Sequence, residues 1–179
     1  MEVEKAIFER RSIRTFTDTD IEPEILEKLC KAAIWSPTGG NAQPWVFISV
    51  SKPETVKLIK TFSPGLLGNP KALIAVLSDK KTNVERMGPL GEILAVMDCS
   101  MAAQNIMLQA CSLGLGSCAI RSFNQEAVRE ILKAPEHLKP ELLVILGYPE
   151  KNPPAPPRRE ETIHREFYGT PGSGGGNDG

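Results

Sequence analysis

A run of six apolar residues at positions 72–77 constrains the fold more than any other stretch of this chain. Side chains on a strand point alternately to the two faces of a sheet, so this run would be apolar on both faces. Such a strand belongs inside a sheet that helices cover on both sides. Three further strands are expected at residues 45–50, 118–120 and 141–146, which are rich in apolar and β-branched residues.

Helices are expected before and between these strands. Two of them begin with a proline and a glutamate, at positions 23–24 and 53–54, which suits the first turn of a helix. The longest expected helix is apolar nearly all round, as in a helix that is buried or that packs against a second subunit. The expected helices are residues 3–8, 23–34, 53–62, 92–113 and 124–133. Residues 82–91 are polar and contain Gly88 and Pro89, so we expect a loop there.

The alternation of these elements predicts an α+β fold with a mixed central sheet and helices on its faces. The length suits one domain, which we expect to span residues 1–168. The remaining residues, 169–179, are rich in glycine and are expected to be disordered.

Composition and charge argue against several classes of protein. The net charge of −1 lacks the overall basic field with which proteins bind nucleic acid. No apolar run is long enough to span a bilayer and no signal peptide is visible, so we expect no membrane partner and a cytoplasmic location. The four cysteines form no CxxC pair, and neither histidine lies at ligand spacing from other metal-binding residues. Reduced thiols and no metal site are therefore expected.

Three arginines and a serine follow the first helix within five residues, as Arg10, Arg11, Ser12 and Arg14. A guanidinium group presents a planar fork of donors that matches the paired oxygens of a phosphate. A serine hydroxyl and nearby backbone N–H groups can complete such a site. The cluster therefore suggests a phosphate monoester ligand, such as the end of a mononucleotide cofactor. The alternative is an ordinary solvated basic turn.

A second candidate is the loop expected at residues 36–45, which reads Ser-Pro-Thr-Gly-Gly-Asn-Ala-Gln-Pro-Trp. Two prolines and two glycines prevent a helix or a central strand here. The loop also carries Thr, Asn and Gln side chains, and tryptophans stand at both of its ends. Such a loop can approach a flat polar ligand with backbone and side chains together. The alternative is an ordinary connection between a helix and a strand.

These features, in this order, closely resemble the nitroreductase family of FMN flavoproteins. The most specific motifs are Arg-Arg-Ser-Ile-Arg-Thr-Phe at 10–16 and the loop at 36–45. A Gly-Leu-Gly-Ser turn at 114–117 and a proline-rich arm that ends in an arginine pair at 158–159 complete the likeness. The resemblance covers about residues 3–168 and implies an intertwined homodimer that binds one FMN at each of two interface sites.

Carried over by position, the residues that would contact FMN fall into five groups. Those at the phosphate and ribityl end are Arg10, Arg11, Ser12 and Arg14. Those that would reach the flavin bound mainly by the other subunit are Pro37, Thr38, Gly39 and Asn41. Those along the ring edge near N5 and O4 are Ala119, Ile120, Arg121 and Ser122. Asn69 and Lys71 would make polar contacts to the ring, and Arg158 or Arg159 would return to the phosphate.

The activity that the resemblance implies is a ping-pong oxidoreduction. NADH or NADPH would give a hydride to N5 of FMN, and a small electron acceptor would then take its place over the same ring face. Because the cofactor performs this chemistry, no catalytic residue of the protein itself is predicted. Nitroaromatics, quinones and free flavins all stay open as acceptors.

Two other functions stay open from the sequence. One is a flavin-storage or electron-transfer protein that binds FMN without efficient NAD(P)H turnover. The other is a protein that binds nucleic acid or a phosphopeptide through the arginines, although the net charge of −1 speaks against it.

Overall fold

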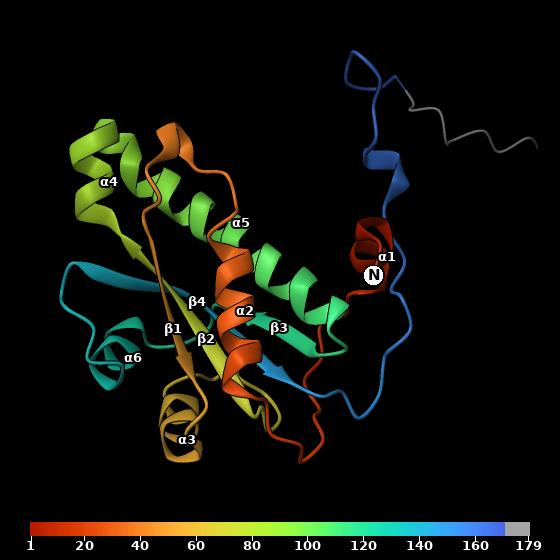
Figure 1. The fold of residues 1–179 in the computed structure, drawn as a ribbon. Helices are drawn as coiled ribbons and strands as arrows, with labels where there is room; N and C mark the ends of the chain where they lie inside the picture. Colours follow the sequence, from red (N-terminus) through yellow and green to blue (C-terminus); the bar gives the residue numbers. More distant parts are fainter. Residues whose placement is uncertain (171–179) are drawn as a thin grey trace, which may run out of the picture.

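Four strands form an antiparallel sheet at the centre of the fold (Figure 1). The computed structural model describes residues 1–170 of the 179-residue chain. The strands are β1 (Trp45–Val50), β2 (Ala72–Asp79), β3 (Gly116–Ile120) and β4 (Leu138–Gly147), in the order β1-β2-β4-β3 across the sheet. Every residue of β2 except Asp79 is buried, which confirms that the apolar run is an interior strand.

The neighbouring strands pair antiparallel throughout this sheet. Within residues 1–170, the parallel character expected for a mixed sheet is confined to an isolated bridge between Ser12 and Ser117. The expected α+β class, with helices on the faces of the sheet, is confirmed.

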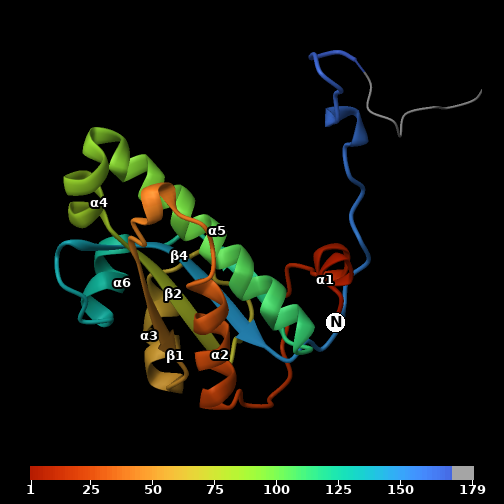
Figure 2. The same ribbon diagram turned by 45° about the horizontal axis from the view of Figure 1, so that its top comes forward.

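Two helices cover each face of the sheet (Figure 2). The core on one face contains buried residues of α2 (Pro23–Ala33) and α5 (Gly91–Ser112), and the core on the other contains residues of α3 (Pro53–Thr61) and α6 (Gln125–Ile131). The short α1 (Val3–Glu9) packs against α5. Three short 3-10 helices complete the described elements, η1 (Gly39–Asn41), η2 (Gly88–Leu90) and η3 (Glu160–Thr162).

The prediction of a loop at residues 82–91 is wrong, because a helix, α4 (Lys80–Met87), follows β2 directly. The Asp79 carboxylate accepts a hydrogen bond from the Thr82 backbone N–H at 3.0 Å and so caps the first turn of this helix. Gly88 does interrupt the helical structure, since α4 ends at Met87 and Gly88 has a φ of 65°. The polar composition that suggested a loop belongs to an exposed helix that packs on α5.

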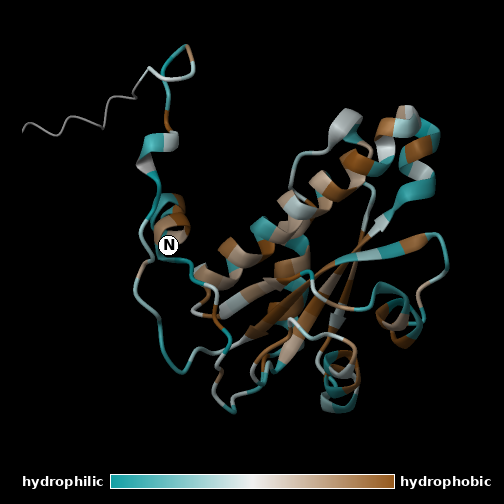
Figure 3. Cartoon of the chain, turned by 180° about the vertical axis from the view of Figure 1, so that it is seen from behind, coloured by the Kyte–Doolittle hydropathy of each residue, from teal (hydrophilic) through white to brown (hydrophobic). Residues whose placement is uncertain are grey.

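Beyond β4 the chain leaves the body as an extended arm at residues 150–170 (Figure 1). Its apolar side chains Ile163, Phe167 and Tyr168 are exposed by 62, 73 and 94%. Figure 3 shows that apolar residues are concentrated on the strands of the sheet, in contrast to much of this arm. The glycine-rich end that was expected to be disordered lies, from residue 171 on, outside the described residues.

The remaining expectations concern the cysteines and the membrane. All four cysteines are free thiols, with Cys99 and Cys118 buried and Cys30 and Cys111 partly buried. Among residues 1–170, no helix combines the length and the apolar character that crossing a membrane requires.

Candidate functional site

The arginine segment is fixed alongside the edge strand β3. The backbone N–H of Ile13 donates to the carbonyl of Ser117 at 2.9 Å, and Ser12 forms the parallel bridge with Ser117. Gly116 makes this close approach possible, since a Cβ atom there would lie 2.8 Å from the Ile13 side chain. The sequence after α1 therefore lies in a defined place against the beginning of β3.

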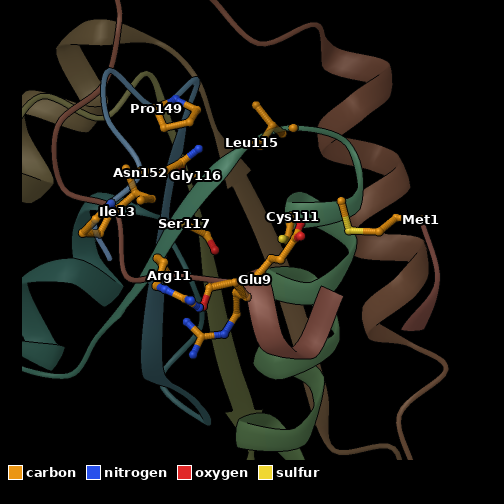
Figure 4. Close-up of a pocket in the computed structure, with 13 residues that line it drawn as sticks. Met1, Glu9, Arg11, Ile13, Cys111, Leu115, Gly116, Ser117, Pro149 and Asn152 are labelled. Atoms are coloured by element: carbon orange, nitrogen blue, oxygen red, sulfur yellow. The ribbon is translucent and has the colours of Figure 1, made fainter. Parts of the chain in front are cut away.

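A hollow of about 360 Å³ opens at this junction (Figure 4). Its lining joins the end of α1, the end of α5, the beginning of β3 and the beginning of the arm. The polar and ionisable side chains that line it come from Glu9, Arg10, Arg11, Cys111, Ser117 and Asn152. Ser12 and Arg14 are exposed and do not line this hollow.

Three polar atoms around the hollow are buried without a hydrogen-bond partner in the protein. They are Nε of Arg10, Nε of Arg11 and Oγ of Ser117. A buried polar atom without a partner costs about 1–3 kcal/mol, so such atoms are rare unless something else satisfies them. Two guanidinium donors and a hydroxyl suit the oxygens of an anion, and a phosphate group in particular.

The backbone of α1 holds Arg11 in position. Its Nη1 donates to the carbonyl of Phe8 at 2.6 Å and to that of Arg10 at 2.9 Å. These bonds satisfy carbonyls at the end of the helix and leave Nε free. Glu9 contributes a negative charge to the same lining, and Lys5 partly offsets it at 3.8 Å. Burial, with the nearby Glu9 carboxylate, raises the pKa of the Cys111 thiol, while Arg10 and Arg11 oppose this rise.

Along β3, the face that carries Ser117 continues to Ala119 and Arg121, because strand side chains alternate. Ala119 is exposed although it lies within the strand, so this face offers a small, smooth apolar surface. Arg121 lies about 13 Å from Ser117 along the strand direction. The side chain of Ile120 points the other way, into the core under α3 and α6, so only its backbone can serve a ligand on this face.

We call the row of Ser117, Ala119 and Arg121 on this face the β3 strip. Arg121 and Ser122 lie at its far end, and both are exposed. The guanidinium of Arg121 is 4.0 Å from Oε2 of Glu141 and 5.7 Å from the ring centroid of Phe123. The carbonyl of Ser122 accepts a hydrogen bond from the Gly65 backbone N–H at 3.0 Å, which anchors the end of the strip to the α3–β2 connection.

The loop at residues 36–45 has an unusual backbone. Gly40, Asn41 and Gln43 adopt left-handed conformations, with φ of 55, 54 and 51°, and such conformations gather at functional sites. The Gln43 side chain donates to Oδ1 of Asn41 at 3.1 Å, and the Gln43 backbone N–H donates to Oγ1 of Thr38 at 3.3 Å. Pro37, Gly40 and Asn41 are exposed, so the loop presents a shaped polar edge to its surroundings.

A buried carboxylate on α5 anchors this loop. Oδ1 of Asp98 accepts a hydrogen bond from the Gly39 backbone N–H at 3.3 Å, while its Oδ2 is buried without a partner in the described chain. Burial raises the pKa of Asp98, and the bond from Gly39 partly opposes that rise. Asp98 lies thirteen residues before Cys111 on the same helix, which is about 20 Å at 1.5 Å per residue. Within one chain, the loop at 36–45 therefore does not reach the hollow lined by Arg10 and Arg11. We call this hollow the arginine hollow.

Asn69 and Lys71 line a different hollow, beside α3. The ammonium of Lys71 pairs with Asp18 at 2.8 Å, which raises its pKa, and Lys60 donates to the Asn69 side chain at 3.4 Å. The preceding residue, Gly68, has a φ of 75°, and a Cβ atom there would lie 1.6 Å from the carbonyl oxygen of Arg14. The connection between α3 and β2 therefore contacts Arg14 but does not line the arginine hollow.

Arg158 and Arg159 lie on the extended arm and are exposed. Arg159 donates to Glu161 on the same arm at 3.0 Å. Within one chain the structure does not return either arginine to the hollow, although Asn152 and Pro153 at the beginning of the arm do line it.

Sequence reasoning omitted two residues that the geometry singles out. Ser117 belongs to the Gly-Leu-Gly-Ser turn, which was noted for its order in the chain but not for its hydroxyl. Glu141 was placed only at the beginning of a core strand, yet it is a buried carboxylate beside Arg121. A charged residue at the head of an apolar strand was the one signal available for it.

Comparison with known proteins shows which family the chain resembles. Residues 7–73 and 60–148 match the sequence profile described as the nitroreductase family. A protein of Archaeoglobus fulgidus with the provisional name NADH dehydrogenase/NAD(P)H nitroreductase is 40% identical over 152 residues, which is 82% of this chain and 84% of that protein. A Bacillus subtilis protein named FMN reductase (NADPH) is 29% identical over 182 residues, covering 92% of this chain and 73% of that protein.

Solved structures extend the likeness to the fold. The structure of an FMN-dependent nitroreductase from Clostridium difficile R20291 superposes with a TM-score of 0.80 at 28% identity. The match covers 92% of this chain and 99% of that chain.

Proposed function

Because this chain belongs to the nitroreductase family, we propose that it is an NAD(P)H-dependent FMN oxidoreductase that passes electrons to a small acceptor in a ping-pong cycle. The family match spans most of the chain, and related proteins carry the names FMN reductase and FMN-dependent nitroreductase. The acceptor class we propose is a nitroaromatic, a quinone or a free flavin.

One observation of this structure carries the proposal further than the family does. Nε of Arg10, Nε of Arg11 and Oγ of Ser117 are buried around one hollow and lack partners in the protein. An FMN phosphate, with a charge near −2, would satisfy all three in a place that is partly shielded from water. The residues present therefore fit the phosphate end of this cofactor.

The face of β3 suits the rest of the cofactor. A flat aromatic ring needs apolar cover without a protruding side chain, and Ala119 offers it at an exposed position of the strand. Arg121 and Ser122 stand where the strip ends and would meet the polar edge of a ring that lies along it. Bound FMN would supply the redox chemistry itself, so the protein needs to bind, orient and shield rather than to donate a proton or a nucleophile.

We also propose that the working unit is a homodimer whose two sites are each built from both subunits. The loop at 36–45 is shaped like a ligand contact, yet it lies about 20 Å along α5 from its own arginine hollow. The outer face of α5 leaves Ile93, Met97 and Met101 exposed by 57, 54 and 39%. A contiguous apolar surface of this kind is typical of a protein interface.

The extended arm gives a second reason for the dimer. Its apolar residues make little contact with their own chain and would be covered if the arm ran along a second copy. In that arrangement Arg158 or Arg159 could approach the phosphate end of a site, as the resemblance implies.

Initial-rate kinetics test the proposed cycle. We expect double-reciprocal plots against NADPH or NADH at several quinone concentrations to give parallel lines, since both substrates would use the same place in turn. Intersecting lines would contradict the proposal that the two substrates bind in turn at the same place. Absence of steady-state turnover with quinones, nitroaromatics and free flavin would instead favour a storage or electron-transfer protein.

A further inference from the structure

Glu141 is a buried carboxylate that the proposed function does not use. Its side chain is only 3% exposed. Val76 of β2 pairs with Leu142 and the next residue, Leu77, pairs with Pro140, so Glu141 is the extra residue of a β-bulge. Bulges redirect a side chain from its regular alternation and are frequent beside active sites.

Three groups surround this carboxylate. The Ser78 hydroxyl donates to Oε1 at 2.8 Å, the Lys80 ammonium lies 3.7 Å from Oε1, and the Arg121 guanidinium lies 4.0 Å from Oε2. Removing a carboxylate from water is costly unless charges and hydrogen bonds compensate it. The Ser78 hydroxyl and the two cations therefore compensate the Glu141 carboxylate in a place where it is shielded from solvent.

The two cations are not equivalent. Lys80 also pairs with Glu92, at 3.7 Å, on the exposed side of α5. Within residues 1–170, Glu141 is the one carboxylate that pairs with Arg121. The charge of Arg121 is therefore compensated by a carboxylate that is itself shielded from solvent.

We infer that Glu141 is a positioning residue that acts through Arg121 and lowers the reduction potential of the bound flavin. This inference rests on the proposed function, because it needs FMN on the β3 strip with its ring edge at Arg121. A cation at the ring edge stabilises the reduced, more negative flavin and raises its potential. A buried carboxylate beside that cation offsets the effect, and low local polarity strengthens the offset.

The test is the midpoint potential of FMN bound to purified variants, measured by anaerobic titration with reference dyes. Glu141→Gln keeps the shape and an acceptor for Ser78 but removes the charge. We expect it to favour reduced over oxidised flavin by about tenfold, a rise of about 30 mV for a two-electron couple. Glu141→Asp, which keeps the charge, should stay near the wild-type potential.

Two further variants keep the inference open to refutation even if Glu141→Gln does not fold. Arg121→Gln removes the half-exposed partner, and we expect a fall in potential of similar size. Glu92→Gln removes the exposed partner of the same Lys80, and we expect no shift, because solvent screens that charge. An unchanged or lower potential in Glu141→Gln, or no change in Arg121→Gln, would overturn the inference.

The two proposals fail in different ways. If the wild-type protein does not bind FMN, or binds it and NAD(P)H does not reduce it, the proposed function is wrong and the inference falls with it. If the wild-type protein is loaded and reducible but its potential is the same in Glu141→Gln, only the inference is wrong.

Discussion

At the scale of single residues, Ser117 is the most specific probe of the site. It is 2% exposed, and its hydroxyl has no hydrogen-bond partner in the described chain although it borders the arginine hollow. Ser117→Ala should therefore leave the flavin-free protein as stable as before or slightly more stable, because an unsatisfied polar atom is removed. The same change should weaken FMN binding by about tenfold, the loss of one charge-assisted hydrogen bond. Thermal unfolding without FMN and a fluorescence titration with FMN measure the two effects. A parallel loss of stability and affinity would contradict this role.

The arginines should show a larger effect on the same titration. Arg10→Ala should weaken FMN binding by about 10–100-fold, or about 1.4–2.7 kcal/mol, because a guanidinium whose buried Nε has no partner in the protein is lost from the phosphate end. Lys52→Ala is a matched control, since it removes one exposed positive charge at the beginning of α3. Riboflavin, which lacks the phosphate, should bind wild type and Arg10→Ala equally well. Equal losses for FMN and riboflavin would mean that Arg10 supports the fold and not the phosphate.

The residue types of the site could be predicted from the sequence, but their contacts could not. Three arginines beside a serine indicate a phosphate ligand through chemistry alone. Which of them face one hollow depends on the bridge between Ser12 and Ser117, which joins segments more than 100 residues apart. Glu141 was missed for a related reason, because a bulge depends on the register of two strands and not on local pattern.

At the scale of elements, the strands and most helices follow from local pattern. Trp45–Val50 was predicted with its observed bounds. The helix expected at 124–133 is α6, whose first turn is capped by Asn124, which accepts a hydrogen bond from the Ala127 N–H at 3.0 Å. The helix α4 was missed because little of it is apolar, so hydrophobic periodicity carried almost no signal. The cap at Asp79, three residues before Thr82, was the readable sign of its beginning.

The anchor between α5 and the loop at 36–45 gives a prediction about pH. Burial raises the folded-state pKa of Asp98 above its ordinary value near 3.8. Below that value both folded and unfolded states are protonated and there is no penalty. As pH rises, the unfolded state ionises first, so the contribution of Asp98 to the free energy of unfolding falls until its folded pKa is passed.

Asp98→Asn should remove this dependence and keep an acceptor for the Gly39 N–H. We expect the variant to unfold about 2–4 °C above wild type at pH 7, as a change of about 1 kcal/mol produces in a protein of this size. This advantage should shrink as the pH falls through the raised pKa of Asp98 towards 3.8. Calorimetry between pH 3.5 and 7 measures it, and an advantage that grows at low pH would contradict the assignment. Asp98→Ala, which removes the acceptor, should not share the gain.

At the scale of the whole molecule, the proposed dimer would bring the loop at 36–45 of one chain to the arginine hollow of the other. The 19.5 kDa chain should therefore have twice that mass in solution when FMN is bound. Light scattering coupled to size exclusion measures this mass. A flavin-loaded particle with the mass of one chain would contradict the shared site.

Charged substitutions on the outer face of α5 test the same interface more locally. Met97→Glu places a carboxylate on a residue that is 54% exposed in one chain, so the fold of the single chain should tolerate it. We expect the dimer to dissociate and FMN to be lost together, because both subunits would build the proposed site. Retained FMN in a dissociated protein would separate the cofactor site from the interface.

The most direct test of the central claim is an anaerobic spectrum of the purified wild-type protein before and after NADPH and then NADH are added. The account predicts flavin absorbance in the visible range that bleaches within seconds with at least one of the two nucleotides. Flavin bands that persist with both nucleotides would contradict the proposed oxidoreductase, although the cofactor site would stand. Absence of flavin bands, with no binding of added FMN, would contradict the assignment of the arginine hollow itself.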